Sequence, residues 1–170
     1  MEIERRDSLL LKKLEESILN NKMDEVTNLL DEIVTQHDTI CNGYLIEQLR
    51  TTENHLLRNQ IALTLSDLKC QEVVDVIIEL IQDPRTDGNR GTLIYALEPL
   101  NYLDHIDVLL NLCLTGNFEV KLQSLQLIKQ VKGNIPKKIR KKYKERLKEE
   151  KEQLIDRKKF LKELKKQINN

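Results

Sequence analysis

The sequence between residues 54 and 131 repeats itself. Residues 54–84, moved forward by 32 positions, align without a gap on the segment that follows. Apolar residues and one arginine then meet their counterparts: Arg58 falls on Arg90, Ile61 on Leu93, Leu65 on Leu97, Leu68 on Leu100, Val74 on Ile106 and Ile77 on Leu109. A period of about 20 to 50 residues with apolar positions in register is typical of stacked helical repeats, in which each unit packs on its neighbours.

The register continues in both directions. A further shift of 31 residues places Arg90 on Lys121, and a backward shift of 32 places Ile77 on Leu45. Hydrophobic residues make up 39% of the chain, and five Gly, three Pro and no Trp leave few breaks in the helical periodicity. This composition favours a chain that is almost entirely helical.

Apolar spacing and capping residues predict the order of the helices. The expected helices cover residues 2–19, 22–36, a segment through 45–49, 54–68, 71–82, a segment from 93 to 100, a segment ending near 114, and 118–131. Pro99 should bend or end the sixth of these near Leu100. Asp104 is expected to cap the seventh.

The breaks in the pattern predict three parts. Residues 1–21 form an N-terminal capping helix, because residues 2–19 lie outside the repeat register. Residues 22–131 hold the repeats. Residues 132–170 form a basic helical tail that follows the breakers Gly133 and Pro136.

The repeats resemble the HEAT family, in particular its short bacterial form, in which one helix ends in Leu-x-Asp and the next opens with Val-Arg-x-x-Ala. The matching residues are Leu80, Asp83 and Arg90 in one copy, Leu57, Arg58, Ile61 and Ala62 in another, and Val120 and Lys121 in a third. The copies depart from the pattern at Thr115, where the Asp is missing, and at Lys121, which replaces Arg. The resemblance implies an all-α fold, a right-handed α-α superhelix (HEAT-like solenoid), with the capping helix before it and the long basic helix after it.

In this family the second helix of each repeat lines a curved inner surface. The residues of this chain expected to point off the apolar face there are Arg58, Asn59, Arg90, Tyr95, Glu98 and Tyr102. Tyr and Arg are frequent anchors of protein interfaces, so these six are the predicted protein-binding residues. An alternative for Arg58 and Arg90 is that they brace the turns between repeats.

Charge divides the chain. Residues 1–131 carry 12 Lys and Arg against 22 Asp and Glu, a net charge of −10, whereas residues 132–170 carry 16 against 6, a net charge of +10. Such asymmetry usually reflects what each segment touches. The tail therefore has three interpretations: it binds nucleic acid, it lies along the acidic body of its own or another copy, or it is a solvated helix. Binding of nucleic acid would use Lys137, Lys138, Arg140, Lys141, Lys142 and Lys144.

A homodimer through the tail is a further hypothesis. Apolar residues recur there every seven residues, at Leu147, Leu154, Leu161 and Ile168. The companion positions are Glu150, Arg157 and Leu164, so only one side of a coiled-coil seam is present.

No residue cluster demands a reaction, a metal or a cofactor. His37 and Cys41 are two ligands where zinc needs about four, and His105 has no nucleophile beside it. Residues 86–91 are glycine-containing but lack the Lys-Ser/Thr of a phosphate-binding loop. Some HEAT-like proteins are DNA glycosylases, which use an aromatic-lined basic cleft, whereas this body is acidic and has no Trp. We therefore expect a protein that is not an enzyme.

Three widely spaced cysteines and the lack of an apolar signal segment favour the cytoplasm. Cys113 falls on Ile81 in the register and is expected to pack in the core. Nothing approaches 18 consecutive apolar residues, so we expect no membrane span. The leading hypothesis is a protein-binding module or adaptor that uses the concave face of the repeats. The alternative is a nucleic-acid-associated protein that binds through its basic C-terminal helix.

Overall fold

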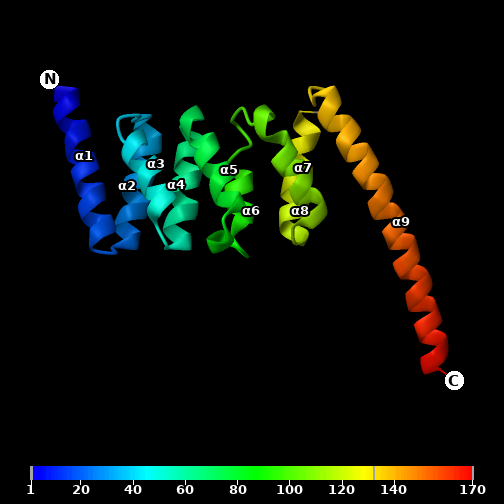
Figure 1. Ribbon diagram of the computed structural model, residues 1–170. Coiled ribbons are helices and arrows are strands. Elements are labelled where there is room, and N and C mark those ends of the chain that lie inside the picture. The colour runs from blue at the N-terminus through cyan, green and yellow to red at the C-terminus, as the bar shows by residue number, and fades with distance from the viewer. Residues whose placement is uncertain (1, 132, 170) are drawn as a thin grey trace. The chain divides into compact units, whose positions relative to one another are not determined.

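The computed structural model describes residues 2–131 and 133–169, with side chains from residue 9 onward (Figure 1). Every regular element in these residues is an α-helix or a short 3-10 helix and no strand occurs, so the all-α prediction is confirmed. The α-helices are α1 (Glu2–Leu19), α2 (Met23–Gln36), α3 (Asn42–Thr51), α4 (His55–Asp67), α5 (Val74–Gln82), α6 (Arg90–Tyr95), α7 (Ile106–Thr115), α8 (Phe118–Gln130) and α9 (Lys137–Ile168). The 3-10 helices are η1 (Gln71–Val73), η2 (Pro84–Thr86) and η3 (Leu103–His105).

Contacts divide the chain into two compact units, residues 1–130 and residues 131–170. None of the described helices has both the length and the apolar character needed to cross a membrane.

The first unit is a two-layered row of helices. Each of α1, α3, α5 and α7 packs against the helix that follows it. The four following helices, α2, α4, α6 and α8, also contact one another in that order (Figure 1). We call these four helices the second-helix row. In the other layer α3 packs against α5.

Apolar residues in the repeat register form the core between the layers. Three register pairs have fully buried side chains: Ile61 and Leu93, Leu65 and Leu97, and Ile77 and Leu109. Burial of one such side chain contributes about 1.5–3 kcal/mol, so equivalent positions stabilise successive repeats in the same way. Cys113 is only half-buried, whereas its register partner Ile81 is fully buried. Cys113 therefore lies closer to the edge of the core than the register predicted.

Side-chain caps begin two of the helices, and a residue in the left-handed conformation ends another. Asn54 accepts hydrogen bonds on Oδ1 from the amide of Leu56, at 3.0 Å, and from the next amide, which starts α4. Asn117 accepts from the amide of Val120 at 2.9 Å and starts α8. His37 ends α2 in the left-handed conformation, with φ of 51°. Each capping side chain of this kind typically contributes about 1 kcal/mol.

Helix α6 is shorter than predicted. It ends at Tyr95, whereas the sequence pattern predicted a helix that reached Leu100. The amides of Leu97 and Leu100 bond to carbonyl oxygens three residues back rather than four. Pro99 has no amide hydrogen and disfavours a helical conformation of the residue before it. Its effect therefore extends one turn further toward the N-terminus than expected.

Asp104 does not cap α7, which corrects the prediction. Neither η3 nor α7 begins with a side-chain cap hydrogen bond. Instead, Oδ1 of Asn101 accepts from the amide of Leu103 at 3.3 Å. The amide of Asn101 donates to Oε1 of Gln71 at 3.0 Å, and Nε2 of Gln71 donates to the carbonyl oxygen of Asn101 at 2.9 Å. The segment that leads into α7 is therefore positioned by Asn101, through the hydrogen bonds between Asn101 and Gln71 of η1.

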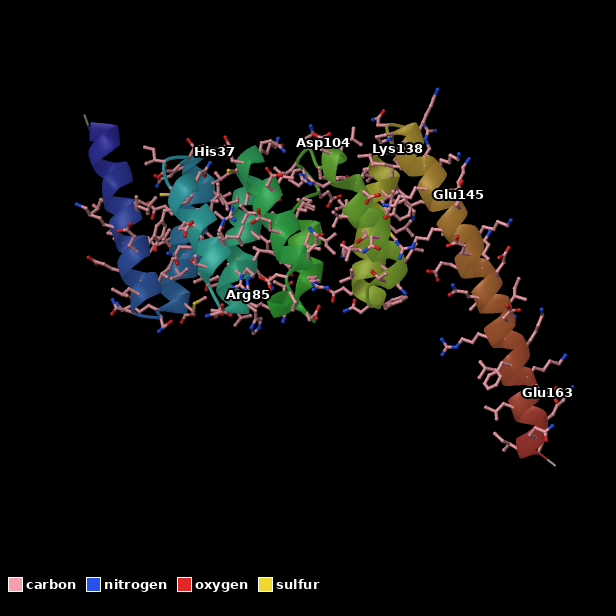
Figure 2. All side chains as sticks on the ribbon, viewed as in Figure 1. His37, Arg85, Asp104, Lys138, Glu145 and Glu163 are labelled. Carbon is pink, nitrogen blue, oxygen red and sulfur yellow. The ribbon has the colours of Figure 1, made fainter. Side chains whose placement is uncertain are left out.

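The second unit contains α9, an uninterrupted helix of 32 residues. At about 1.5 Å per residue it is roughly 48 Å long. Ion pairs spaced by three or four residues support it, namely Lys148 with Glu152, Lys159 with Asp156 and Lys166 with Glu163. All residues from 147 to 169 are exposed. Side chains project from all sides of this part of the helix (Figure 2).

Candidate functional site on the second-helix row

Arg58 was predicted on an exposed binding surface, but the structure buries it. Only 2% of the residue is exposed, and its Nη2 donates a hydrogen bond to the carbonyl oxygen of Thr52. Thr52 is the capping residue that directly follows α3. The guanidinium group therefore closes the turn between α3 and α4 and is not accessible to a partner.

Arg90 lies one repeat later and makes the equivalent contact. Its Nη2 donates at 3.1 Å to the carbonyl oxygen of Asp83, the capping residue that directly follows α5. Its Nε donates to Oγ1 of Thr86 at 3.2 Å, and its Nη2 lies 2.6 Å from Oδ1 of Asp87. The Arg90 side chain is 20% exposed. These contacts correspond to the turn-bracing alternative for both arginines.

Tyr102 is also buried, which corrects its placement on the predicted surface. Its residue is 3% exposed, and its hydroxyl donates toward α8, lying 2.9 Å from the carbonyl oxygen of Leu127 and 3.2 Å from Oε1 of Gln130. Burial, helped by the nearby charge of Glu98, raises the pKa of the Tyr102 hydroxyl. Tyr102 therefore ties the segment after α6 to α8.

The other three predicted residues are more accessible. Tyr95 is 49% exposed on α6. Glu98 is partly exposed, and its Oε1 accepts hydrogen bonds from Nε2 of Gln130 at 2.7 Å and of Gln126 at 3.3 Å. Asn59 is partly exposed, but its Oδ1 is buried and accepts no hydrogen bond in the described part of the chain. Tyr95 is therefore the predicted residue that is best placed to meet a partner.

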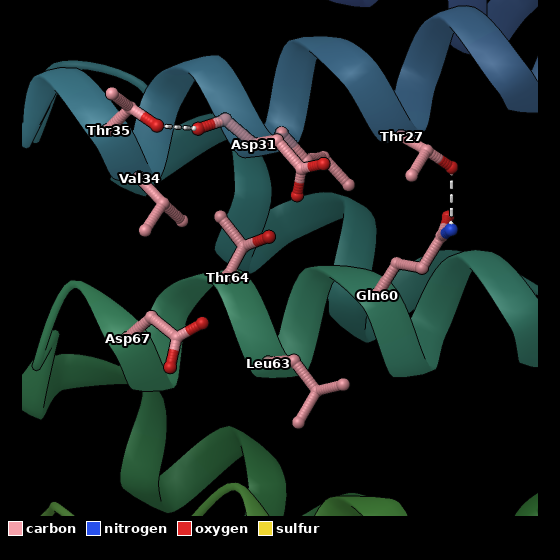
Figure 3. Close-up of a pocket in the computed structure, with 9 residues that line it drawn as sticks. Thr27, Asp31, Val34, Thr35, Gln60, Leu63, Thr64 and Asp67 are labelled. Carbon is pink, nitrogen blue, oxygen red and sulfur yellow. Dashed lines mark hydrogen bonds between the residues drawn. The ribbon is translucent and has the colours of Figure 1, made fainter.

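The structure adds a groove that the sequence did not predict. It lies between α2 and α4 and has a volume of about 510 Å³ (Figure 3). Its lining comes from Thr27, Leu30, Asp31, Val34 and Thr35 of α2 and from Gln60, Leu63, Thr64 and Asp67 of α4. A hydrogen bond of 2.7 Å from Nε2 of Gln60 to Oγ1 of Thr27 crosses one end of it (Figure 3).

The groove combines apolar side chains with two negative charges. Leu30 is buried, and Val34 and Leu63 are partly exposed. Asp31 and Asp67 are exposed, one from each helix, and within the described residues neither carboxylate makes a hydrogen bond or an ion pair. No Lys or Arg lines the groove. The groove therefore favours a ligand that brings a positive charge beside an apolar group.

The repeat register connects the groove to Tyr95. Asp31, Leu63 and Tyr95 are separated by 32 residues each and thus occupy equivalent positions in three repeats. Leu63 lines the groove, and α4 contacts α6, which carries Tyr95. The candidate site is therefore one surface that runs from α2 to α6 along the second-helix row.

The residues weighed for metal binding or catalysis do not assemble. Nε2 of His105 lies 2.8 Å from Oδ1 of Asp75, and this contact links η3 to α5. His37 ends α2, while Cys41 is buried at the start of α3, so they do not share one helix face. Within the described residues no three metal-ligating side chains come together.

The basic residues predicted to contact nucleic acid all lie on the first two turns of α9. Lys137, Lys138, Arg140, Lys141, Lys142 and Lys144 are exposed. At about 100° per residue they cover an arc of roughly 200°. Tyr143 lies outside this arc, with its ring centre 5.2 Å from Nζ of Lys142 and 5.9 Å from the guanidinium carbon of Arg146.

Comparison of the chain with protein-family models, with curated proteins and with solved structures gives no match.

Proposed function

We propose that this protein is a non-enzymatic binding module or adaptor that holds another protein along the second-helix row of a short HEAT-like repeat stack. The observation that carries the proposal is the groove between α2 and α4 and its continuation to Tyr95. The right-handed superhelix belongs to the proposal. Its support is the 32-residue register together with the contacts of α2, α4, α6 and α8 in chain order.

The partner that fits this surface is a protein segment with a Lys or Arg side chain next to an apolar one. The apolar side chain would cover Leu63 and Val34, and the cation would meet the carboxylates of Asp31 and Asp67. Residues 1–131 have a net charge of −10, which attracts a cationic partner over a distance of roughly 8–10 Å at physiological salt. Stacked repeats commonly present extended surfaces of this kind to proteins.

Quantitative capture of partners from the source cell tests the proposal. The groove variant carries Asp31→Lys and Asp67→Lys, and a second variant carries Tyr95→Ala. The control carries Glu47→Lys and Asp104→Lys, because these exposed carboxylates lie outside the second-helix row and make no hydrogen bond or ion pair in the described residues. The control changes the net charge by the same amount as the groove variant.

We expect the wild type and the control to capture the same specific partner. The groove variant should capture about tenfold less of it, the effect of losing about 1.4 kcal/mol of binding free energy. Circular dichroism must show that each variant is folded. A folded groove variant that retains every specific partner at the level of the control would refute the proposed site.

Binding of nucleic acid through α9 is a second candidate function. It is favoured by the six exposed basic side chains on the first two turns of that helix. The affinity for duplex DNA should then fall with salt, with a log-log slope of about −0.9 for each phosphate neutralised. Removal of residues 136–170 should abolish binding. Absence of binding to DNA and RNA at about 50 mM salt would eliminate this candidate.

A further inference from the structure

One face of α9 carries a stripe of exposed apolar side chains. It consists of Leu147, Leu154, Leu161, Leu164 and Ile168, whose exposed fractions lie between 44% and 74%. On an α-helix these positions fall within an arc of roughly 100°. A row of large exposed apolar side chains along one helix face is characteristic of an interaction site. We call these five residues the α9 stripe.

Lysines follow one edge of the α9 stripe. They are spaced by seven residues, at Lys144, Lys151, Lys158 and Lys165, and we call them the lysine edge. In the described part of the chain none of them forms an ion pair. Lys148, Lys159 and Lys166, which lie farther from the stripe, instead pair with acids of α9 itself. The lysine edge is therefore a row of uncompensated positive charge beside an apolar surface.

Two charged residues of opposite sign lie within the stripe. Glu150 and Arg157 occupy the positions between successive leucines in the seven-residue pattern. Both are exposed and make no ion pair within the described residues. Charged residues at such positions specify the register and partner of paired helices, because each must find an opposite charge when the seam closes.

We propose that the α9 stripe docks an acidic amphipathic helix of a partner protein. The apolar seam of that helix packs on the stripe, and its Asp and Glu residues lie against the lysine edge. A basic and an acidic residue of the partner meet Glu150 and Arg157 and set the register. This surface is separate from the groove of α2 and α4, so the proposal does not depend on the proposed function.

Charge complementarity argues against a second copy of α9 as the occupant. In a parallel pair, Glu150 would face Glu150 and Arg157 would face Arg157 across the seam. In an antiparallel pair that sets Leu147 against Leu164, the lysine edges of the two copies would meet. Like charges placed opposite each other destabilise both arrangements.

A lipid surface is also disfavoured as the occupant. Helices that lie in the membrane interface bury a continuous apolar face below the level of the headgroups. Burial of the α9 stripe in that way would remove Glu150 and Arg157 from water without supplying partners for them, which is costly. A partner helix can supply both opposite charges.

The test uses the full chain and two synthetic helical peptides of about four heptads. Both peptides have the same leucine seam, but one has Glu and the other Lys at the flanking positions. Binding is measured by fluorescence anisotropy. We expect the Glu-flanked peptide to bind at least about tenfold more tightly than the Lys-flanked one, with an affinity that decreases between about 0.05 and 0.5 M NaCl.

Variants locate the binding to the stripe. Leu154→Asp with Leu161→Asp should weaken binding of the Glu-flanked peptide at least about tenfold. Ile155→Ala is the control, because Ile155 is 53% exposed but lies outside the α9 stripe, and Ala leaves the charge of the neighbouring lysine edge unchanged. It should change the affinity by less than about twofold. Lys151→Glu with Lys158→Glu should reverse the preference between the two peptides, whereas Lys159→Glu with Lys166→Glu should not.

Three results would overturn the proposal. Equal binding of both peptides, or binding of neither, would show that the lysine edge does not select an acidic helix. A dimer in analytical ultracentrifugation that is lost in the Leu154→Asp, Leu161→Asp variant would identify a second copy as the occupant. Stripe-dependent binding to phosphatidylglycerol vesicles without a preference between the peptides would identify a lipid surface.

Discussion

Gly116 and Gly91 should respond in opposite ways to replacement by Ala. At Gly116 a Cβ atom would lie 2.8 Å from the carbonyl oxygen of Leu112 and would clash with the side chain of Val120. At Gly91 a Cβ atom would instead meet the carboxylate end of the Glu119 side chain. Gly116 therefore faces a rigid turn between α7 and α8, whereas Gly91 faces a flexible carboxylate.

The two magnitudes follow from these neighbours. Val120 is 3% exposed and the carbonyl of Leu112 belongs to α7, so overpacking should cost about 1–3 kcal/mol. Gly116 has φ of −66°, which Ala adopts without strain, and the loss of unfolded-state freedom offsets about 0.4–1 kcal/mol of this cost. We therefore expect Gly116→Ala to destabilise the fold by about 1–2 kcal/mol, or roughly 2–8 °C in Tm.

Gly91→Ala should instead be neutral or stabilising by up to about 1 kcal/mol, because it lies in α6 and Ala is the better helix former. The carboxylate of Glu119 is exposed and makes no hydrogen bond within the described residues, so it can move aside. Urea and thermal unfolding of both full-length variants, followed by circular dichroism, measure the two effects. Equal stability of Gly116→Ala and the wild type would show that the close approach of α7 and α8 at this turn is wrong.

Tyr102→Phe should reduce the free energy of unfolding by about 1–2 kcal/mol, because the carbonyl oxygen of Leu127 loses the hydrogen bond from the Tyr102 hydroxyl. The capture of a protein partner should stay unchanged. A loss of capture without a loss of stability would contradict the structural role of Tyr102. Burial first, and then a hydrogen bond to an acid, raise the pKa of the Cys70 thiol from 9.0 to about 11. Alkylation of Cys70 at about pH 8, followed by mass spectrometry, should therefore be roughly 100-fold slower than that of a free cysteine, and an equal rate would refute this environment. The amide and then the guanidinium of Arg85 hold the pKa of Asp83 below 3.8. The contact between Arg85 and Asp83 therefore stabilises the fold above about pH 3.8, and this stabilisation is lost as the pH falls through the lowered pKa of Asp83. Arg85→Ala should raise the pKa of Asp83 in an NMR titration. An unchanged pKa would exclude the guanidinium contact.

The repeat register predicted the helical elements because it reports which positions must be buried. Ile61 and Leu93, for example, stand at equivalent positions and are both fully buried. The register could not predict whether Arg58 is exposed or buried. An arginine at this position can either face solvent or reach back to the end of the preceding helix. That choice depends on the location of a backbone carbonyl, which the pattern of apolar residues does not encode.

The groove was missed for a related reason. Asp31 and Asp67 are exposed polar residues on two amphipathic helices, and hydrophobic periodicity treats all such residues alike. Their place on opposite sides of one groove depends on how α2 packs against α4. The available signal was the spacing of Thr27, Asp31 and Thr35, which lie four residues apart on one side of α2.

The two candidate surfaces have opposite charge preferences, and this gives the adaptor proposal a specific consequence. The groove favours a cation through Asp31 and Asp67, and the lysine edge of α9 favours an acidic helix. If each surface binds its own partner, a change in one should leave the other unaffected. At about 0.15 M salt the screening length is about 8 Å, so the charges added by Asp31→Lys and Asp67→Lys should act mainly on the ligand in the groove itself.

We therefore expect the Asp31→Lys, Asp67→Lys variant to bind the Glu-flanked peptide with an affinity within about twofold of the wild type at this salt concentration. The Leu154→Asp, Leu161→Asp variant should likewise capture the groove partner at the level of the wild type. Effects of independent sites on binding free energy add to within about 0.3–0.5 kcal/mol. A change of about tenfold or more in either cross-measurement would show that the two surfaces serve one partner, and the chain would then be a single-partner binding protein rather than an adaptor.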